Sequence, residues 1–453
     1  MPRHRIRRAV LLAGAATLVV TTAALAHTAL RRSKPAEDEH LGAPPAEIVL
    51  TFTSGVDPRL ARVQLLGADG GAVLLDSLRS GASDSSVVAP IAERLGGGEY
   101  TVVWQVVGTD GHPVRGQFAF LVDAPVAVTP APAAVDPERP PVPAVVEEPA
   151  SDVQAPSYVA VRWLTFATLL IAIGAVVFRA VVLEPVRRAS SLPSGGAADQ
   201  AATRAAVLGR GAAGFLLLAA GARLLLQLHV VDPGGEGGML GVMVFDTVWG
   251  WGWLLQIGAA LVALLAFHRA ARERGGWGVA AIAVLLLAFT PGLSGHAAAA
   301  ETLAPVAIGL DAVHVFAASA WLGTLLVMLV AGIPSALAQG GAGGRGMVAD
   351  LVNRFSPFAL VFAGVLAATG VGNALMHFGA LNQLWTTSYG RTLLLKLAFV
   401  GLALGLGAFN WRRVRPTLAE AGPARLRRSA ALELLAAAAI LLVTALLVAT
   451  PTP

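Results

Sequence analysis

The pattern of hydrophobic and polar residues divides the chain into two regions of different character. Between residues 27 and 123, apolar residues alternate with polar ones in short segments, as at Ile48, Leu50 and Phe52. Such alternation is typical of β-strands with one buried face. The predicted strands cover 47–52, 62–66, 72–76, 86–91, 100–107 and 117–122. Because glycine-rich turns separate them, we predict a small all-β sandwich or barrel.

From residue 157 onward the apolar runs become long and carry few charges. Eight of them approach or exceed the ~20 residues that a helix needs to cross a bilayer. They cover 157–183, 206–228, 249–268, 277–293, 304–333, 355–378, 389–410 and 428–449. We therefore predict a membrane domain over 157–449, an all-α polytopic bundle of about eight helices.

Residues 1–26 have the pattern of a secretory signal peptide. Arginines precede an apolar run, and Ala24 and Ala26 form a small-x-small cleavage site. Cleavage after Ala26 would make His27 the first residue of the mature protein. The segment 124–156 is rich in Pro, Ala and Val and predicts an extended linker between an exported domain, 27–123, and the membrane domain.

Basic residues occupy alternate connections between the predicted spans. The connections without Lys or Arg are 229–248, 294–303 and 379–388. This positive-inside pattern predicts a multi-pass protein of the cytoplasmic (inner) membrane, with its N-terminal domain on the extracytoplasmic, periplasmic side. Arg391 and Lys396 carry positive charge near that outer side, where Asp246 or Glu301 could balance it.

Composition narrows the chemistry further. The chain is 55% hydrophobic and 13% charged, and its net charge of +5 reflects the arginine-rich loops rather than a nucleic-acid surface. There is no cysteine, which excludes disulfides, thiolate metal sites and a cysteine nucleophile.

His27 and the segment Asp110-Gly111-His112 supply donors for a metal site. A terminal histidine offers both its α-amine and its imidazole, and residues two apart in an extended chain point to the same side. Nitrogen and oxygen donors without sulfur favour Cu(II) over Cu(I). We therefore predict a Cu(II) site formed by His27, Asp110 and His112. The alternative for the second segment is a β-turn in which Asp110 caps the backbone.

Several segments of 27–123 resemble the copper-binding exported protein family CopC. They are His27-Thr28-Ala29-Leu30, Ser33-Lys34-Pro35-Ala36, Leu50-Thr51-Phe52 and Thr109-Asp110-Gly111-His112-Pro113-Val114-Arg115-Gly116. The resemblance implies a seven-stranded, immunoglobulin-like β-sandwich that binds one Cu(II) through His27, Asp110 and His112. Members that also bind Cu(I) carry Met-rich segments, and 27–123 contains no methionine.

Four ionisable residues near the outer side of the predicted bundle are candidates for a copper path. Asp311 and His314 lie three residues apart and share one helix face, His296 precedes their span, and His377 ends the sixth span. Ionisable groups within membrane spans are costly and are often functional. Two alternatives remain open: hydrogen bonds that hold the helices together, and haem bound by two histidines from different helices.

Four motifs in the second half resemble the multi-spanning copper resistance family CopD. They are Ser294-Gly295-His296-Ala297, Asp311-Ala312-Val313-His314 with Ala320-Trp321-Leu322-Gly323, Arg354-Phe355-Ser356, and Gly390-Arg391-Thr392-Leu393-Leu394-Leu395-Lys396. The whole chain therefore resembles a CopC–CopD fusion: an immunoglobulin-like sandwich followed by a helical membrane bundle. The resemblance implies copper uptake or handling across the cytoplasmic membrane.

The preferred hypothesis is a copper-handling protein whose exported domain binds Cu(II) and passes it to the membrane domain for transport. Its partners would be the copper ion, the lipid bilayer and an extracytoplasmic copper chaperone or reductase, with no nucleic acid. We expect copper rather than haem as the bound group, and no catalytic residues. The alternatives are copper sequestration without transport, a haem-containing electron carrier or copper reductase, and a copper monooxygenase.

Overall fold

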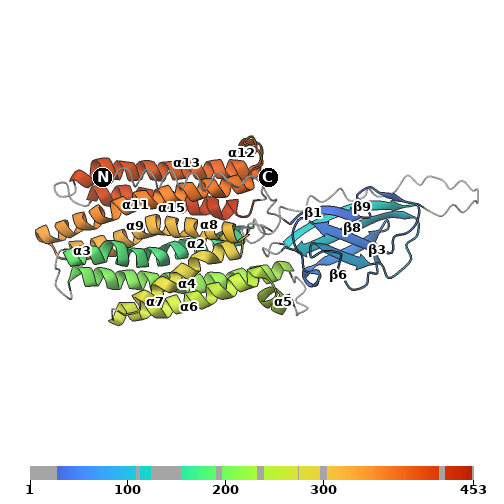
Figure 1. Cartoon of the computed structure of the whole chain (residues 1–453), viewed down its shortest axis with the longest axis horizontal. Helices are drawn as coiled ribbons and strands as arrows, with labels where there is room; N and C mark the ends of the chain where they lie inside the picture. The colour runs from blue at the N-terminus through green and yellow to red at the C-terminus, as the bar shows by residue number, and fades with distance from the viewer. Residues whose placement is uncertain are drawn as a thin grey trace, which may run out of the picture. The chain divides into compact units, whose positions relative to one another are not determined.

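The computed structural model describes residues 28–108, 113–123, 155–189, 196–231, 239–273, 275–295, 304–417 and 424–450. The chain forms two compact units, which are treated separately below (Figure 1). The first unit comprises His27–Ala155 together with Gln227–Thr247. The second comprises Pro156–Leu226 and Val248–Pro453.

The first unit contains a β-sandwich of two sheets. Its strands are β1 (Leu30–Lys34), β2 (His40–Leu41), β3 (Glu47–Phe52), β4 (Arg62–Gly67), β5 (Ala72–Val73), β6 (Arg79–Ser80), β7 (Ser86–Pro90), β8 (Gly98–Val107) and β9 (Pro113–Val122). One sheet has the order β1-β3-β7-β6 and the other β2-β9-β8-β4-β5. The neighbouring strands are antiparallel, apart from the parallel pair β2–β9. The predicted all-β sandwich is therefore confirmed.

The core of the sandwich is built from one face of each long strand. In β3, Ile48, Leu50 and Phe52 are buried while the residues between them are half-buried. The Phe52 ring packs edge-on against Trp104 of β8, with ring centroids 5.3 Å apart. Because burying one large apolar side chain contributes roughly 1.5–3 kcal/mol, this shared core holds the two sheets together.

The described residues form nine strands, two more than the CopC resemblance implies. The additional pairing is at the edges of the sheets, where β2, β5 and β6 have two residues each. The sequence pattern did not predict β1, because Arg31, Arg32 and Lys34 interrupt any apolar alternation there. Charged residues on an edge strand disfavour pairing with a further chain, so this composition suits an edge position.

The second unit is a bundle of long helices. Its elements begin with α2 (Pro156–Val177), the π-helical η4 (Phe178–Leu183), α3 (Glu184–Ala189), α4 (Ala197–Val231), α6 (Val248–Glu273) and α7 (Trp277–Leu293). They continue with α8 (Ala304–Ala318), η6 (Ser319–Gly323, π), α9 (Thr324–Val327), η7 (Met328–Gly332, π), α10 (Ile333–Leu337) and α11 (Gly341–His377). The last are α12 (Gln383–Thr386), α13 (Ser388–Phe409), η8 (Asn410–Val414, π), η9 (Arg415–Thr417) and α15 (Ala424–Leu447). The end of α4 and the short α5 (Met239–Phe245) belong to the first unit.

Seven of these helical stretches are long and apolar enough to cross a membrane. The predicted span 277–293 corresponds to α7, which has 17 residues and falls short of that length. Of the eight predicted spans, seven thus correspond to candidate membrane-spanning helices and one to a shorter apolar helix among the described residues. Many large apolar side chains on the long helices are exposed, as Leu218, Leu265 and Leu360 illustrate, which fits helices that face lipid.

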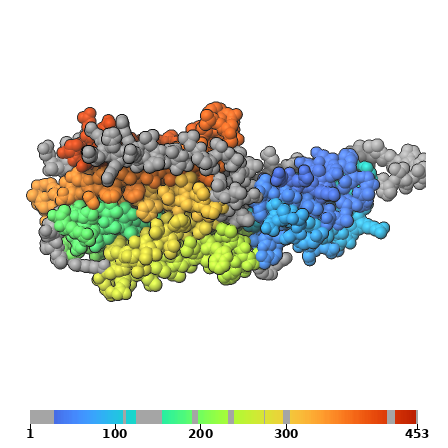
Figure 2. Space-filling view, in the orientation of Figure 1, coloured from blue at the N-terminus to red at the C-terminus, as the bar shows by residue number. Residues whose placement is uncertain are grey.

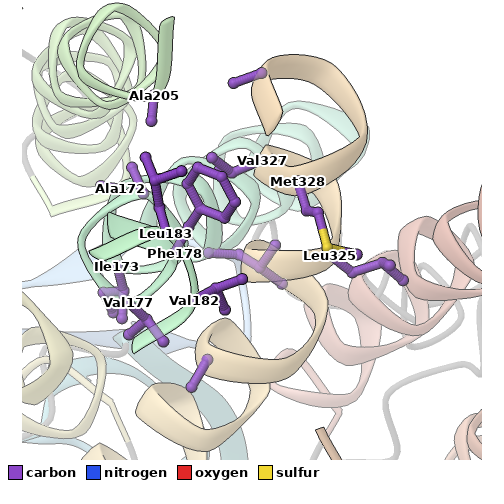
Figure 3. Packing of buried hydrophobic residues seen from close by; sticks show 14 of the residues in the cluster. Ala172, Ile173, Val177, Phe178, Val182, Leu183, Ala205, Leu325, Val327 and Met328 are labelled. Atoms are coloured by element: carbon purple, nitrogen blue, oxygen red, sulfur yellow. The ribbon is translucent and has the colours of Figure 1, made fainter. Parts of the chain in front are cut away.

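The centre of the bundle is packed from small and medium apolar side chains. Phe178 of η4 is fully buried among side chains of α2, α4 and the 324–332 segment (Figure 3). The long helices of this unit run side by side (Figure 1), and Figure 2 shows the surface that they present on one face. Gly174 of α2 and Gly323 of η6 lie in close contact, and a Cβ on Gly323 would lie 2.0 Å from the carbonyl oxygen of Leu170. Small residues allow such close contact between membrane helices.

Candidate functional site

The predicted Cu(II) ligands His27, Asp110 and His112 lie outside the described residues. The structure therefore does not show whether they meet. It does describe their immediate neighbours, Thr28 on one side and Gly108 and Pro113 on the other. Since β8 and β9 pair from Val107 to Pro113, residues 108–112 form the connection between two paired strands.

One short segment, 53–56, contacts the neighbours of both predicted ligand positions. The buried Thr28 side chain hydrogen-bonds Ser54, and Thr53 accepts a hydrogen bond from the Ala29 N–H over 2.9 Å. Two residues further along, Val56 forms an antiparallel bridge with Gly108. Thr28 and Gly108 therefore lie at the same end of the sandwich.

His40 lies at the other end of β9. It is exposed and pairs with Leu121, whereas the β8–β9 connection joins β9 at Pro113. Eight residues of strand separate the two positions, roughly 26 Å at the usual rise per residue. His40 is therefore remote from the predicted site. The described residues contain no group of three His, Asp or Glu side chains that could hold a metal ion.

A network of charges in the first unit involves Arg59 of the short helix η2 (Pro58–Leu60). Its guanidinium contacts Asp57 at 2.7 Å and Asp246 at 2.8 Å. Hydrogen bonding to Arg59 holds the pKa of Asp57 below its ordinary value, and the two carboxylates raise the pKa of Arg59. Asp246 is thus paired with Arg59, and it is not the counter-charge that the sequence suggested for Arg391 or Lys396.

In the bundle, the structure brings two of the four predicted path residues together. Asp311 and His314 both lie on α8, and the Nδ1 atom of His314 lies 2.9 Å from the Thr369 hydroxyl on α11. Lys396 of α13 lies within electrostatic range of both Asp311 and His314. Three helices therefore contribute polar groups to one location, which we call the α8 cluster: Asp311, His314, Thr369 and Lys396.

The other two predicted path residues are not joined to this cluster by any described contact. His296 lies outside the described residues, and His377 is the last residue of α11, where its backbone alone is described. Thr369 precedes His377 by eight residues, about 12 Å along a helix.

Sequence reasoning missed three polar residues of the bundle: Thr369, Asn410 and Glu433. Thr369 is unremarkable by type, and nothing in its spacing points to a histidine on another helix. Glu433 is buried in α15 with an exposed fraction of 3% and accepts a hydrogen bond from Asn410. The sequence does carry one signal for Glu433, because it is an ionisable residue within an apolar span.

Comparison with known families agrees with this architecture. Residues 30–123 match the CopC domain, residues 152–306 match the N-terminal domain of copper resistance protein D-like proteins, and residues 349–447 match copper resistance protein D. A β-sandwich fused to a helical membrane bundle, with these matches, defines a membrane protein of the copper resistance class. The chain belongs to the CopC–CopD family, as a fusion of the two parts.

Three known proteins are similar to most or part of this chain. The copper transport protein CutJ of Bacillus subtilis is 25% identical over 86% of this chain and 68% of its own length. Copper resistance protein C of Pseudomonas syringae pv. tomato is 33% identical over 24% of this chain and 90% of that protein. The crystal structure of CopC from Methylosinus trichosporium OB3b covers 22% of this chain and 95% of its own, with 28% identity and a TM-score of 0.21.

Proposed function

We propose that this protein captures Cu(II) through His27, Asp110 and His112 and passes it to the helical bundle for transport across the cytoplasmic membrane. In this proposal it acts as a binding and transport protein and not as an enzyme. The family membership and the similarity to a copper transport protein support copper as the cargo. The observation that carries the proposal is the contact of segment 53–56 with both flanks of the predicted Cu(II) site.

This contact limits the distance between the predicted ligands. Ser54 and Val56 are about 6.8 Å apart in extended chain, and the hydrogen bond and the β-bridge add about 5–7 Å each, so Thr28 and Gly108 lie within roughly 20 Å of each other. His27 immediately precedes Thr28, and each further residue adds up to ~3.6 Å of reach. The remaining chain is therefore long enough to bring the imidazole of His27 and the Asp110–His112 pair to one ion.

The donor set suits Cu(II). The α-amine and imidazole of His27, the imidazole of His112 and the carboxylate of Asp110 provide nitrogen and oxygen ligands. Segment 27–123 contains neither cysteine nor methionine, so it offers no sulfur ligand for Cu(I). Amine and imidazole bind metal in their deprotonated forms, and the affinity should therefore fall as the pH is lowered.

The α8 cluster supports an acceptor within the bundle. The Thr369 hydroxyl lies 2.9 Å from the Val365 carbonyl oxygen, which gives its single proton an acceptor. The hydroxyl can then accept a hydrogen bond from Nδ1–H of His314. That tautomer leaves the Nε2 lone pair of His314 for a metal, and a hydrogen bond on the other ring nitrogen is usual for metal-binding histidines. His296 and His377 would extend the path from Asp311 and His314 toward the outer surface.

The arrangement of charge supports the orientation. With the arginine-rich connections in the cytoplasm, the sandwich and the start of α8 lie on the outer side of the membrane. An extracytoplasmic copper chaperone or reductase would be the natural partner on that side, since it could supply copper or change its oxidation state before transfer.

The Cu(II) site can be tested by moving His27 away from the mature N-terminus. Full-length protein would be purified from membranes, its first residue identified by mass spectrometry, and Cu(II) affinity measured by titration and electron paramagnetic resonance. Insertion of one glycine between Ala26 and His27 should weaken binding at least tenfold, about 1.4 kcal/mol, because the amine–imidazole chelate is lost. His40→Asn is the matched control and should leave the affinity unchanged. Equal affinity with and without the inserted glycine would refute the terminal chelate.

Transport is tested separately in cells. Deletion of the gene should lower cellular copper if the protein imports the metal, and re-expression should restore it. Loss of a protein that only sequesters copper outside the cytoplasm should not lower the cytoplasmic pool. An unchanged cytoplasmic pool would therefore favour sequestration and contradict the transport part of the proposal.

A further inference from the structure

Glu433 is a carboxyl group buried within the helical bundle. It lies on α15, nine residues after the helix begins at Ala424, or about 14 Å along the axis. Its exposed fraction is 3%. Trp321, which contacts Glu433, lies seven residues beyond His314 of the α8 cluster on the same continuous helical stretch, about 10 Å along the axis. Glu433 is thus a second and separate polar position.

The groups that contact this carboxyl are neutral and come from two other helical stretches. Asn410, at the start of η8, donates a hydrogen bond from Nδ2 to Oε2 over 3.2 Å. The indole N–H of Trp321, in η6, donates to the same carboxyl. The other oxygen, Oε1, faces Gly407, where a Cβ would lie 3.5 Å from it. The carboxyl therefore sits against one turn of the α13–η8 helix.

The charged residues on the neighbouring elements are exposed to solvent or lie far from Glu433 along the helices. Those nearest in sequence are exposed; they are Arg412, Arg413, Arg427 and Arg428. Lys396 of α13 precedes Asn410 by 14 residues, about 21 Å along the helix. On α2, Arg162 adjoins Trp163, whose indole bonds the Ala438 carbonyl toward the other end of α15. The recorded partners of Glu433 therefore offer no positive charge, and an ionised carboxylate in such surroundings is costly.

Asn410 supplies a second, independent observation. Its Oδ1 atom is buried and has no hydrogen-bond donor among the described residues. Buried polar atoms are normally satisfied, so an unpaired oxygen beside a carboxyl calls for an explanation. A protonated Glu433 would carry the missing donor, because an acid O–H can bond an amide oxygen while the amide N–H bonds the acid carbonyl.

We propose that Glu433, held by Asn410 and Trp321, is a proton-exchange site that binds a proton in the absence of copper and releases it when the cation enters the bundle. In that step the carboxyl O–H bond breaks, the proton passes to water, and the copper cation balances the carboxylate charge. The exchange rests on the proposed copper transport. Both donors lie in π-helical segments, which occur frequently at functional sites in membrane and soluble helices alike.

Infrared difference spectroscopy on the purified full-length protein tests this directly. Copper would be added as Cu(II), and as Cu(I) under reducing conditions, and the carbonyl band of protonated carboxyl groups followed. We expect one or both additions to remove the equivalent of one protonated carboxyl per chain. Glu433→Gln should abolish this change. Glu273→Gln is the matched control, since Glu273 is an exposed carboxylate at the end of α6, and it should retain the change.

A second variant guards against a folding defect in Glu433→Gln. Trp321→Phe removes one donor but keeps an aromatic ring, and it should shift the frequency of the band without removing it. A band that copper does not alter, or that persists in Glu433→Gln, would overturn the proposal.

Copper uptake by vesicles containing the protein separates the proton-exchange proposal from the proposed copper transport. Uptake without a carboxyl change refutes proton exchange alone, and a carboxyl change without uptake refutes the transport function alone.

Discussion

The contact between Gly174 of α2 and Gly323 of η6 predicts a strong effect for a very small substitution, Gly323→Ala. The added methyl group would lie 2.0 Å from the Leu170 carbonyl oxygen and 3.2 Å from the Gly174 Cα atom. Its obstacles are backbone atoms, so no change of side-chain rotamer can relieve the clash. The α2 and η6 backbones would have to move apart.

The loss of stability expected for Gly323→Ala follows from the distance between the added methyl group and the Leu170 carbonyl oxygen. A carbon and an oxygen normally approach no closer than about 3.2 Å, so the two backbones must separate by roughly 1 Å, which loosens the buried side chains on both sides. Overpacking of this kind costs about 1–3 kcal/mol and occasionally more, and a backbone clash belongs at the upper end. Replacing Gly by Ala within a helix gains up to about 1 kcal/mol in water, so we expect a net loss near 2 kcal/mol.

Gly258→Ala is the matched control. Gly258 lies within α6, and a Cβ there would meet nothing within 4 Å. The assay is equilibrium unfolding of the purified protein in mixed micelles, followed by tryptophan fluorescence or circular dichroism. Gly258→Ala should be neutral or slightly stabilising, and Gly323→Ala should lower the free energy of unfolding. If Gly323→Ala is as stable as Gly258→Ala, the close approach of α2 and η6 is wrong.

Three further predictions concern other parts of the molecule. Because Arg59 holds the folded pKa of Asp57 low, this carboxylate contributes stability above its unfolded pKa of about 3.9 that disappears as the pH falls through the folded value. Acid unfolding followed by circular dichroism should therefore show a smaller loss for Asp57→Asn than for the wild type. Gly116→Ala would place a Cβ 2.6 Å from an indole carbon of the paired strand, and it should lower the thermal midpoint of the sandwich by overpacking worth about 1–3 kcal/mol. Lys396→Met and Asp311→Asn should together destabilise the bundle by less than the sum of the single effects, by ~1 kcal/mol, and strict additivity would argue against their electrostatic interaction.

The sequence pattern predicted the elements that contribute most to the core. The pattern identified β3, β4, β7, β8 and β9, because their apolar residues are buried in the core of the sandwich. It missed β1, β2 and β6, which lie at the sheet edges and are held mainly by backbone pairing with a neighbour. Backbone pairing leaves little trace in side-chain hydrophobicity, so edge strands of this kind are not accessible to a pattern argument.

The ends of the helices are also predicted less well than their apolar centres. The sixth span was predicted to begin at residue 355, but α11 begins at Gly341 and includes Arg345, Asp350 and Arg354. A hydropathy window ends where charges appear, whereas the backbone hydrogen bonds continue through them into the interfacial region. Apolar length therefore predicts where a helix crosses lipid and underestimates how far it extends on either side.

The α8 cluster was predictable in part. Three-residue spacing placed Asp311 and His314 on one helix face, and both do lie on α8 with polar neighbours. Thr369 is 55 residues away from His314 on another helix, and only packing brings its hydroxyl to the imidazole. The position of Lys396 has a structural reason: it lies within electrostatic range of Asp311, whose charge would otherwise be unfavourable in the bundle.

Glu433 illustrates why a single charge in an apolar span is the hardest signal to interpret. A carboxyl at that depth could reach toward the interface, face a neighbouring helix or bind a cation, and the mostly apolar residues around it in α15 do not distinguish these cases. The distinction comes from two donors on separate helices, Asn410 and Trp321, which converge on it. A glutamine amide at this position could accept a hydrogen bond through its oxygen and donate to Asn410 Oδ1 through its NH2 group without the capacity to ionise, so a structural role alone does not require a carboxyl. Comparing glutamate with glutamine here separates the two roles, because glutamine retains the packing and loses only the exchangeable acid proton.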